Sequence, residues 1–383
     1  MMSSNKRQKY DLGSLLQQYR VELNHQYALS FAQEKAIGDL IRCRTAEQGG
    51  HASRCSNCGH TEHSYNSCRN RNCPKCQQTK QIQWIDKLKS GLPPTRYFHI
   101  VFTIPQALHR IFYANQATCY DLLLKTAAQT LKQVAKSRNG IGADVGGISL
   151  LHTWGQALTY HPHVHMLVPA GGLSEDRMEW INANKKFFVP VKVLSKVFRG
   201  IFCKNMETQL RKGNLFMHED SRWKDLKNQL YQKNWNVYVK PALAGSEKVL
   251  EYLGRYTHRV AISNERITQV RDQKVTFRVK DYRASSLARK MELPVLEFLR
   301  RFLQHVLPSG FYKIRYFGFL AQVNVGKLGK QVLALLEQCS LVPEFEGLSA
   351  GEIYSVITGN RKNKCPVCQV GRLIPLHLAV PPS

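Results

Sequence analysis

Two closely spaced cysteine pairs constrain the fold of this chain more than any other feature. Cys55-x-x-Cys58 and Cys73-x-x-Cys76 lie fourteen residues apart in a polar, glycine-containing segment. Pairs at this spacing fold back in two tight turns, which a tetrahedral zinc ion held by four thiolates closes. The sequence therefore predicts a zinc-binding module over residues 46–90, with Cys55, Cys58, Cys73 and Cys76 as ligands. Four neighbouring side chains remain alternative ligands: Cys68, His51, His60 and His63.

A third cysteine pair, Cys365-x-x-Cys368, lies near the C-terminus and is half of a zinc site. Completing it requires His377, another thiol of the fold or a partner chain. The alternative is a pair that binds no metal.

The charge balance favours a nucleic-acid partner. The 383 residues include 55 lysines and arginines against 27 acidic residues, a net charge of +28. Such an excess favours DNA or RNA because each bound phosphate releases a counterion. Three basic residues crowd the cysteine module and are predicted to bind DNA, with an ordinary solvated surface as the alternative: Arg69, Arg71 and Lys75.

The N-terminus lacks the apolar segment of a signal peptide, and no apolar run is long enough to span a membrane. We therefore expect a cytoplasmic protein with no membrane partner. Eleven cysteines in such a chain point to metal rather than to disulfides.

A histidine pair lies on a predicted strand, in His161-Pro162-His163-Val164-His165. Side chains alternate between the two faces of a strand, so His163 and His165 point the same way and can bind one metal ion. Val164 and the apolar residues after it would form the buried face. The ordinary alternative is a pair of polar surface residues.

A predicted helix over about residues 246–259 carries Tyr252 and Tyr256, which are neighbours at a spacing of four. Tyr252 lies on a basic stripe, whereas Tyr256 borders an apolar stripe, so core packing is the stronger alternative for Tyr256. A metal beside a tyrosine pair can cut a phosphodiester and hold one end covalently. Three cations share the stripe of Tyr252 and are predicted to bind DNA: Lys248, Arg255 and Arg259.

Hydrophobic periodicity predicts a mixed α+β chain. Residues 10–45 have helical spacing, residues 97–104 form a buried strand, and a β-hairpin over 266–279 turns near Asp272-Gln273. The predicted domains are an N-terminal helical segment, the zinc module, a large central domain and a C-terminal helical tail with the third cysteine pair: 1–45, 46–90, 91–325 and 326–383.

Ordered sequence blocks run through nearly the whole chain: residues 65–76, 101–105, 154–156, 161–165, 252–263, 297–302 and 313–318. In these blocks the sequence resembles the rolling-circle transposases of the insertion sequence ninety-one family, within the HUH (His, hydrophobic, His) single-strand endonucleases. The resemblance implies an α+β HUH domain with a central antiparallel sheet and flanking helices, preceded by a four-cysteine zinc-binding module.

The resemblance also implies site roles. His163 and His165 would hold catalytic Mg²⁺ or Mn²⁺, Tyr252 and Tyr256 would be the paired nucleophiles, and the four cysteines of the module would hold structural Zn²⁺. A third ligand of the catalytic metal is usual in the superfamily, and four side chains could supply it: His99, His152, Gln156 and His258.

The implied activity is nicking of single-stranded DNA at element ends through a 5′-phosphotyrosine intermediate, followed by rolling-circle-type transposition. The expected partners are single-stranded DNA at the element ends and target, and host replication or helicase proteins. Two alternatives remain open. One is a plasmid or phage replication initiator or relaxase, and the other is an inactive zinc-dependent nucleic-acid-binding protein.

Overall fold

Two compact units, each assembled from segments far apart in the sequence, make up the protein. The computed structural model describes residues 10–76, 78–138, 140–184, 188–217, 222–243, 261–281, 287–338, 342–359 and 364–376. The first unit comprises Met1–Lys87, His258–Val306 and Pro343–Ser383, and the second comprises Leu88–Thr257 and Leu307–Val342. This division differs from the four consecutive domains expected from sequence, because segments of the central and C-terminal regions pack with the N-terminal helices.

The first unit begins with three short helices, α1 (Leu12–Gln18), α2 (Arg20–Gln26) and α3 (Phe31–Arg42). A capping box starts α3, in which the Ser30 hydroxyl accepts from the Gln33 N–H and the Gln33 side chain accepts from the Ser30 N–H. Leu12 and Ile37 are fully buried where α1 and α3 pack. Cys43 is the C-cap residue of α3, so this packing fixes the position of one thiol.

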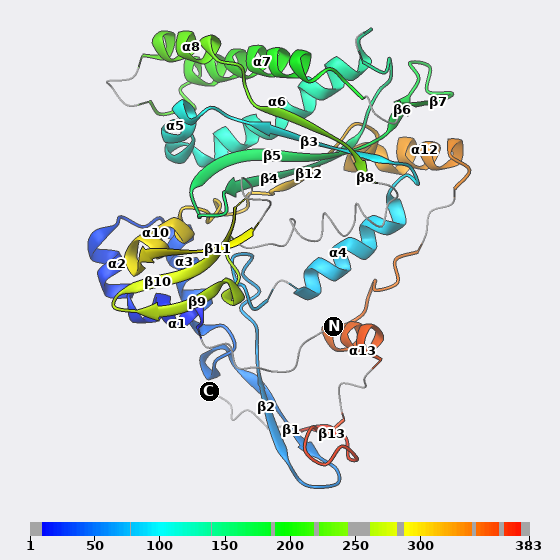
Figure 1. Cartoon of the computed structure of the whole chain (residues 1–383). Coiled ribbons are helices and arrows are strands. Elements are labelled where there is room, and N and C mark those ends of the chain that lie inside the picture. The colour runs from blue at the N-terminus through cyan, green and yellow to red at the C-terminus, as the bar shows by residue number, and fades with distance from the viewer. Residues whose placement is uncertain are drawn as a thin grey trace. The chain divides into compact units, whose positions relative to one another are not determined.

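The same unit contains an antiparallel sheet of β9 (Ile267–Arg271), β10 (Lys274–Asp281) and β11 (Leu287–Pro294) (Figure 1). The helix that follows, α10 (Val295–Leu303), contacts both this sheet and α2. Asp272 and Gln273 have φ of 50° and 55°, the left-handed values of a two-residue hairpin turn. The structure therefore confirms the predicted hairpin. The Leu12 N–H donates to Asn264 Oδ1 at 3.2 Å, which connects α1 to the start of this segment.

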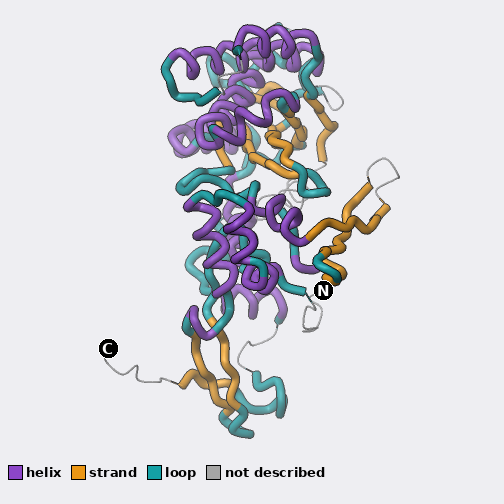
Figure 2. Tube along the Cα trace, turned by 90° about the vertical axis from the view of Figure 1, so that its left-hand side faces the viewer, coloured by secondary structure: helices purple, strands orange, loops and turns teal. Residues whose placement is uncertain are grey.

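A second small sheet in this unit joins the two ends of the chain. Its strand order is β13 (Leu373–Leu376), β1 (Gly50–Cys55) and β2 (Thr61–Tyr65), with both pairings antiparallel. Figure 2 shows these three strands side by side at the lower end of the trace. The remaining helix of the C-terminal segment is α13 (Ala350–Thr358), and α4 (Gln78–Gly91) runs from the first unit into the second.

The second unit is built on a five-stranded antiparallel sheet with β5 in the centre. The strand order is β12 (Ile314–Phe317), β4 (Gly147–Trp154), β5 (Tyr160–Pro169), β3 (Tyr97–Thr103) and β8 (Val237–Leu243). A separate pair, β6 (Gly171–Leu173) and β7 (Trp180–Asn182), follows β5. The central antiparallel sheet with flanking helices confirms the predicted α+β class.

Helices cover one face of this sheet: α5 (His109–Ala114), α6 (Gln116–Lys136), α7 (Val191–Arg211) and α8 (Trp223–Gln232) (Figure 1). Val164, Met166 and Val168 of β5 are fully buried in the core beneath them. The alternation along β5 therefore leaves His163 and His165 on the opposite face. Short helices follow β12: α11 (Gln322–Asn324), the π-helical Val325–Gly329 and α12 (Lys330–Leu335).

Within the described ranges, no helix combines the length and the apolar character needed to cross a membrane.

Candidate functional site

Three histidines meet on the face of the central sheet that is opposite the core helices. His163 and His165 come from β5, and His152 lies directly across from His163 on β4. One ligand nitrogen of each lies within 4.8 Å of the others. Cross-strand neighbours share a face of the sheet, so the pairing register itself brings the third imidazole to the pair. The arrangement could hold one metal ion with three nitrogen ligands.

Hydrogen bonds fix the orientation of two of these rings. His163 Nδ1 lies 2.6 Å from the backbone oxygen of His161, to which it can only donate. That contact leaves His163 Nε2 as the nitrogen with a lone pair for a metal. His165 Nδ1 lies 2.8 Å from His99 Nε2 on the neighbouring strand β3. Partners of this kind set the tautomer and aim of metal-binding histidines.

The surroundings keep these imidazoles neutral at neutral pH. Burial lowers the pKa of His163 to about 4. Burial and then the nearby Lys240 lower the pKa of His99 to about 4, and burial followed by His152 holds the pKa of His165 well below its usual range. Only the neutral imidazole has a lone pair to offer, so the site is prepared to bind metal.

The geometry favours His152 over the other side chains considered as the third ligand. His99 contacts His165 through a ring nitrogen, which is the position of a supporting partner. The His152 ring instead lies at 4.5 Å from that of His165 and 5.6 Å from that of His163, centroid to centroid. His258 lies outside the described residues, and Gln156 lies in the turn between β4 and β5, beyond the paired residues of these strands.

The predicted nucleophiles and the cations near them cannot be placed against this histidine group. All five lie outside the described residues: Tyr252, Tyr256, Lys248, Arg255 and Arg259.

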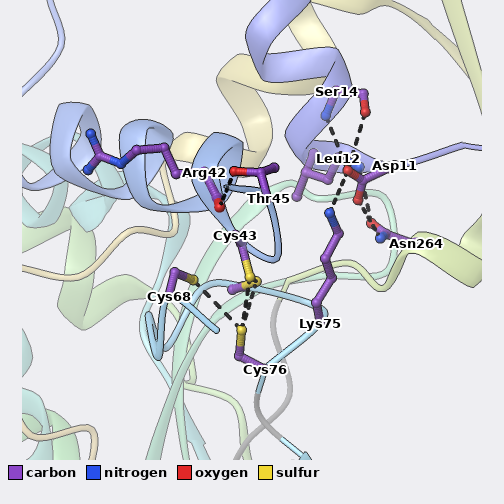
Figure 3. A network of polar contacts seen from close by, with 11 residues as sticks. Asp11, Leu12, Ser14, Arg42, Cys43, Thr45, Cys68, Lys75, Cys76 and Asn264 are labelled. Atoms are coloured by element: carbon purple, nitrogen blue, oxygen red, sulfur yellow. Dashed lines mark hydrogen bonds and ion pairs between the residues drawn. The ribbon is translucent and has the colours of Figure 1, made fainter. Parts of the chain in front are cut away.

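The structure does not bring the four predicted zinc ligands together. Cys73 and Cys76 instead join two single cysteines, in what we call the α3 cluster: Cys43, Cys68, Cys73 and Cys76. Figure 3 shows the side chains of Cys43, Cys68 and Cys76 pointing toward one another. The Sγ atoms of Cys43 and Cys76 are 3.1 Å apart, and those of Cys68 and Cys76 are 3.8 Å apart. Cys68 is one of the alternative zinc ligands predicted from the sequence, whereas the spacing of the cysteine pairs did not predict Cys43 as a ligand.

Cys55 and Cys58 form a second group with the C-terminal pair, which we call the terminal cluster: Cys55, Cys58, Cys365 and Cys368. The C-terminal pair is therefore completed by other thiols of the fold, one of the alternatives left open by sequence. Backbone N–H groups of Gly371 and Val370 lower the pKa of Cys368 to about 6, which favours the thiolate that metals bind.

The three basic residues predicted to bind DNA near the cysteine pairs differ in how accessible they are to DNA. Lys75 forms an ion pair with Asp11 at 2.8 Å, and Asp11 also accepts from the Asn264 amide at 2.8 Å (Figure 3). Lys75 thus connects the α3 cluster to α1. Arg69 is exposed, and Arg71 is half-buried, with its pKa lowered by desolvation. Of the three predicted DNA contacts in the module, Arg69 is the most accessible.

A signal for the actual grouping exists in the sequence, although spacing within one segment does not reveal it. Cys55-x-x-Cys58-Gly59 and Cys365-x-x-Cys368-Gln369 form turns of the same kind, and the second pair had no partner nearby. If the Cys365–Cys368 pair is matched with the Cys55–Cys58 pair, then Cys73 and Cys76 need two further cysteines to complete a site of their own.

Two family models match the chain. One is described as a putative transposase and matches residues 146–327, which include His152, His163 and His165. The other is described as a transposase zinc-binding domain and matches residues 15–104, which include the α3 cluster and the first pair of the terminal cluster.

Two relatives are similar over most of their length. A putative transposase of Sinorhizobium fredii, y4qJ, is 41% identical over 361 residues, which cover 92% of this chain and 90% of the relative. The transposase for insertion sequence element IS801 of Pseudomonas savastanoi pv. phaseolicola is 30% identical over 314 residues, covering 81% of this chain and 75% of the relative. No solved structure matches.

Proposed function

The chain belongs to the transposases of the insertion sequence ninety-one family and carries their zinc-binding domain. From this membership we propose how it cuts and transfers DNA. It nicks single-stranded DNA at element ends through a 5′-phosphotyrosine intermediate and catalyses rolling-circle-type transposition. The observation that carries the proposal is the group of His152, His163 and His165 on one face of the central sheet.

These three imidazoles fit a catalytic divalent ion. Two are oriented by hydrogen bonds through Nδ1, and burial keeps them neutral. A bound Mg²⁺ or Mn²⁺ would polarise the scissile phosphate while keeping open positions for its oxygens. Imidazole nitrogen is a softer ligand than Mg²⁺ prefers, so we expect Mn²⁺ to support the reaction better.

The family resemblance supplies the nucleophiles, Tyr252 and Tyr256. The phenolate oxygen attacks phosphorus, a new tyrosine–phosphate bond forms, and the bond to the 3′ oxygen breaks to leave a free 3′-hydroxyl. Because the phosphoester energy is conserved in the adduct, a later attack by a hydroxyl can rejoin the strands without ATP. Strand separation would then depend on a helicase of the host.

A covalent adduct is the direct test of this function. The purified protein is incubated with Mn²⁺ and labelled single strands that carry the element ends, and denaturing electrophoresis separates any protein-linked product. A labelled band at the mass of the protein plus the fragment on the 3′ side of the cut, which the tyrosine holds through its 5′-phosphate, supports the proposal. A nicked product with no protein attached contradicts it, because it would indicate hydrolysis by water.

Binding to single strands should weaken steeply as salt rises. The net charge of +28 and the exposed Arg69 point to binding dominated by phosphate contacts. About five such contacts give a slope of about −3.5 for log affinity against log salt concentration. Fluorescence anisotropy over a salt series measures the slope. A flat response, or tighter binding to uninterrupted duplex than to single strands, would count against the proposed substrate.

His99 should act on the metal through His165. Replacing His99 with alanine removes the 2.8 Å contact to His165 Nδ1, and loss of such a partner lowers metal affinity by about 10–100-fold. We expect His99→Ala to need correspondingly more Mn²⁺ for half-maximal nicking and to reach the normal rate at saturation. His99→Gln, whose amide can contact the same nitrogen, is the matched variant and should recover most of the affinity. A loss that no Mn²⁺ concentration restores would instead make His99 a ligand.

A further inference from the structure

The two halves of the terminal cluster are turns of the same construction. One turn follows β1 and the other precedes β13. In each, the residue after the second cysteine has a positive φ, 71° at Gly59 and 58° at Gln369. Its N–H donates to the backbone oxygen of the first cysteine, at 3.2 Å to Cys55 and 3.1 Å to Cys365. Paired turns of this kind present two sulfur atoms each toward a shared centre.

We propose that the terminal cluster binds a second structural zinc ion, separate from that of the α3 cluster, and that this ion fastens the C-terminal strand to the N-terminal hairpin. The two halves of the site are 307 to 313 residues apart in sequence. The matched zinc-binding domain covers residues 15–104 and so includes only one of the two halves.

The sulfur positions fit zinc. Cys55 Sγ lies 3.7 Å from Cys368 Sγ, Cys58 Sγ lies 3.7 Å from Cys365 Sγ, and all four sulfurs lie within 4.8 Å of one another. A tetrahedral site with zinc–sulfur bonds of about 2.3 Å has sulfur–sulfur edges of about 3.8 Å. Four thiolates fill the coordination sphere, so the ion has no open position for substrate and serves structure.

Backbone groups of both turns support charged sulfur. The N–H groups of Asn57 and Cys58 point at Cys55 Sγ, at 3.4 Å and 3.5 Å. The Gly371 N–H points at Cys368 Sγ at 3.3 Å. Hydrogen bonds to an ionised acceptor stabilise its charge, which offsets the repulsion among thiolates brought to one point.

Close contact between the two turns depends on Gly371. A Cβ at this position would collide with Cys55 Sγ and approach the Asn57 Cβ to 2.6 Å. Beside it, the Ser56 N–H donates to the Arg372 oxygen at 2.9 Å, and the Arg372 N–H donates to the Ser56 hydroxyl at 3.1 Å. The two turns are therefore in direct contact, through close packing at Gly371 and through the two hydrogen bonds between Ser56 and Arg372.

The sheet that carries the cluster has little core of its own. Every residue of β2 is exposed, and only Ala52 and Cys55 of β1 are buried. Such a small apolar interior cannot stabilise three short strands alone, so a metal ion would supply much of the folding energy.

Zinc stoichiometry of the full-length protein tests the proposal without any DNA, so its outcome is independent of the proposed function. Native mass spectrometry of the wild type, after mild chelation that clears the open histidine group of metal, should find about two zinc ions per chain. Cys365→Ser with Cys368→Ser should leave about one, and so should Cys55→Ser with Cys58→Ser. The variant with all four changes should also keep about one, because the four thiolates hold a single ion.

Two further measurements apply where a cysteine variant fails to fold. Cobalt titration of the metal-free wild type should give the absorption of tetrahedral cobalt–thiolate centres that saturates at about two equivalents. Gly371→Ala should release one zinc ion to a chelator about tenfold faster than wild type, by analogy with other changes next to metal ligands. Gly200→Ala, where nothing lies within 4 Å of the added Cβ, is the matched control.

One zinc ion in the wild type would overturn the proposal, as would two ions retained by the Cys365→Ser, Cys368→Ser variant. Loss of both ions from the four-cysteine variant, in protein whose circular dichroism stays native, would also overturn it, because the two clusters would then not be separate sites.

Discussion

Replacing His163 and His165 together with alanine is expected to slow nicking of single-stranded element ends by about a thousandfold, which corresponds to the loss of about 4 kcal/mol of charge stabilisation at the phosphate. The two rings belong to the group of three histidines whose ring nitrogens lie within 4.8 Å of one another and could hold one metal ion. The fold should survive, because the buried side chains of β5 lie on its other face. Gel assays of a labelled single strand measure the rate, and circular dichroism checks the fold.

His161→Ala is the matched control for this pair. His161 lies on the same strand and contacts His163 through its backbone oxygen, which the substitution retains. It does not belong to the group of three. We expect near-normal nicking by His161→Ala. Full activity of the double variant, with the same Mn²⁺ dependence as the wild type, would remove the histidine group from the mechanism.

Tyr252→Phe is expected to lose the first covalent adduct, with a fall of about a thousandfold or more because no other oxygen takes the place of a missing nucleophile. Tyr252 is assigned the first cut because it shares a predicted helical stripe with Lys248, Arg255 and Arg259. Those cations would attract the phosphate and favour the phenolate. Tyr256→Phe should still form the adduct but fail to complete transposition, since strand transfer requires donor and target ends to be held together.

Mass spectrometry of the adduct formed with a suicide oligonucleotide identifies the modified tyrosine. A first adduct found only on Tyr256 would refute the order. Complete transposition by Tyr256→Phe would refute a mechanism with two nucleophiles. Tyr238→Phe, at an exposed tyrosine of β8, is a matched control that should change neither step.

Local patterns were sufficient to predict the histidine strand and the hairpin. Alternation along β5 gave the side of His163 and His165, and the burial of Val164 and Met166 follows from the same two-residue period. The sequence left His152 as one of four possible third metal ligands, because its position beside His163 depends on the register between β4 and β5. Register is a property of strand pairing, and no single strand encodes it.

Residues 311–320 show how one segment can satisfy two expectations. In the sequence, aromatic residues alternate here with Lys313 and Arg315, a pattern that fits either a strand or a surface that stacks on the bases of single-stranded nucleic acid. Ile314–Phe317 is the edge strand β12, and Phe317 and Phe319 are buried in the fold. Tyr312 is 78% exposed, so one aromatic side chain remains accessible. Propensity predicted the strand, but which rings face the core depends on the neighbouring strand β4.

The cysteine grouping could not be obtained from spacing, because spacing treats neighbours in sequence as neighbours in space. Cys58 and Cys73 are near in the chain, yet β1 and β2 carry the first pair to a sheet that ends with β13. Cys43 reaches Cys73 only because α3 ends beside it, with the two sulfurs 3.5 Å apart. Each cluster is thus set by tertiary packing that the pairs themselves do not specify.

The distance between the two halves of the terminal cluster has a consequence for synthesis on the ribosome. Cys55 and Cys58 leave the ribosome more than 300 residues before Cys365 and Cys368, a delay of roughly 15–60 s at elongation rates of about 5–20 residues per second. Throughout that time the hairpin carries half of a coordination site. A product cut short by a premature stop codon or a frameshift would keep it half-made, so completion of this sheet distinguishes full-length chains from truncated ones.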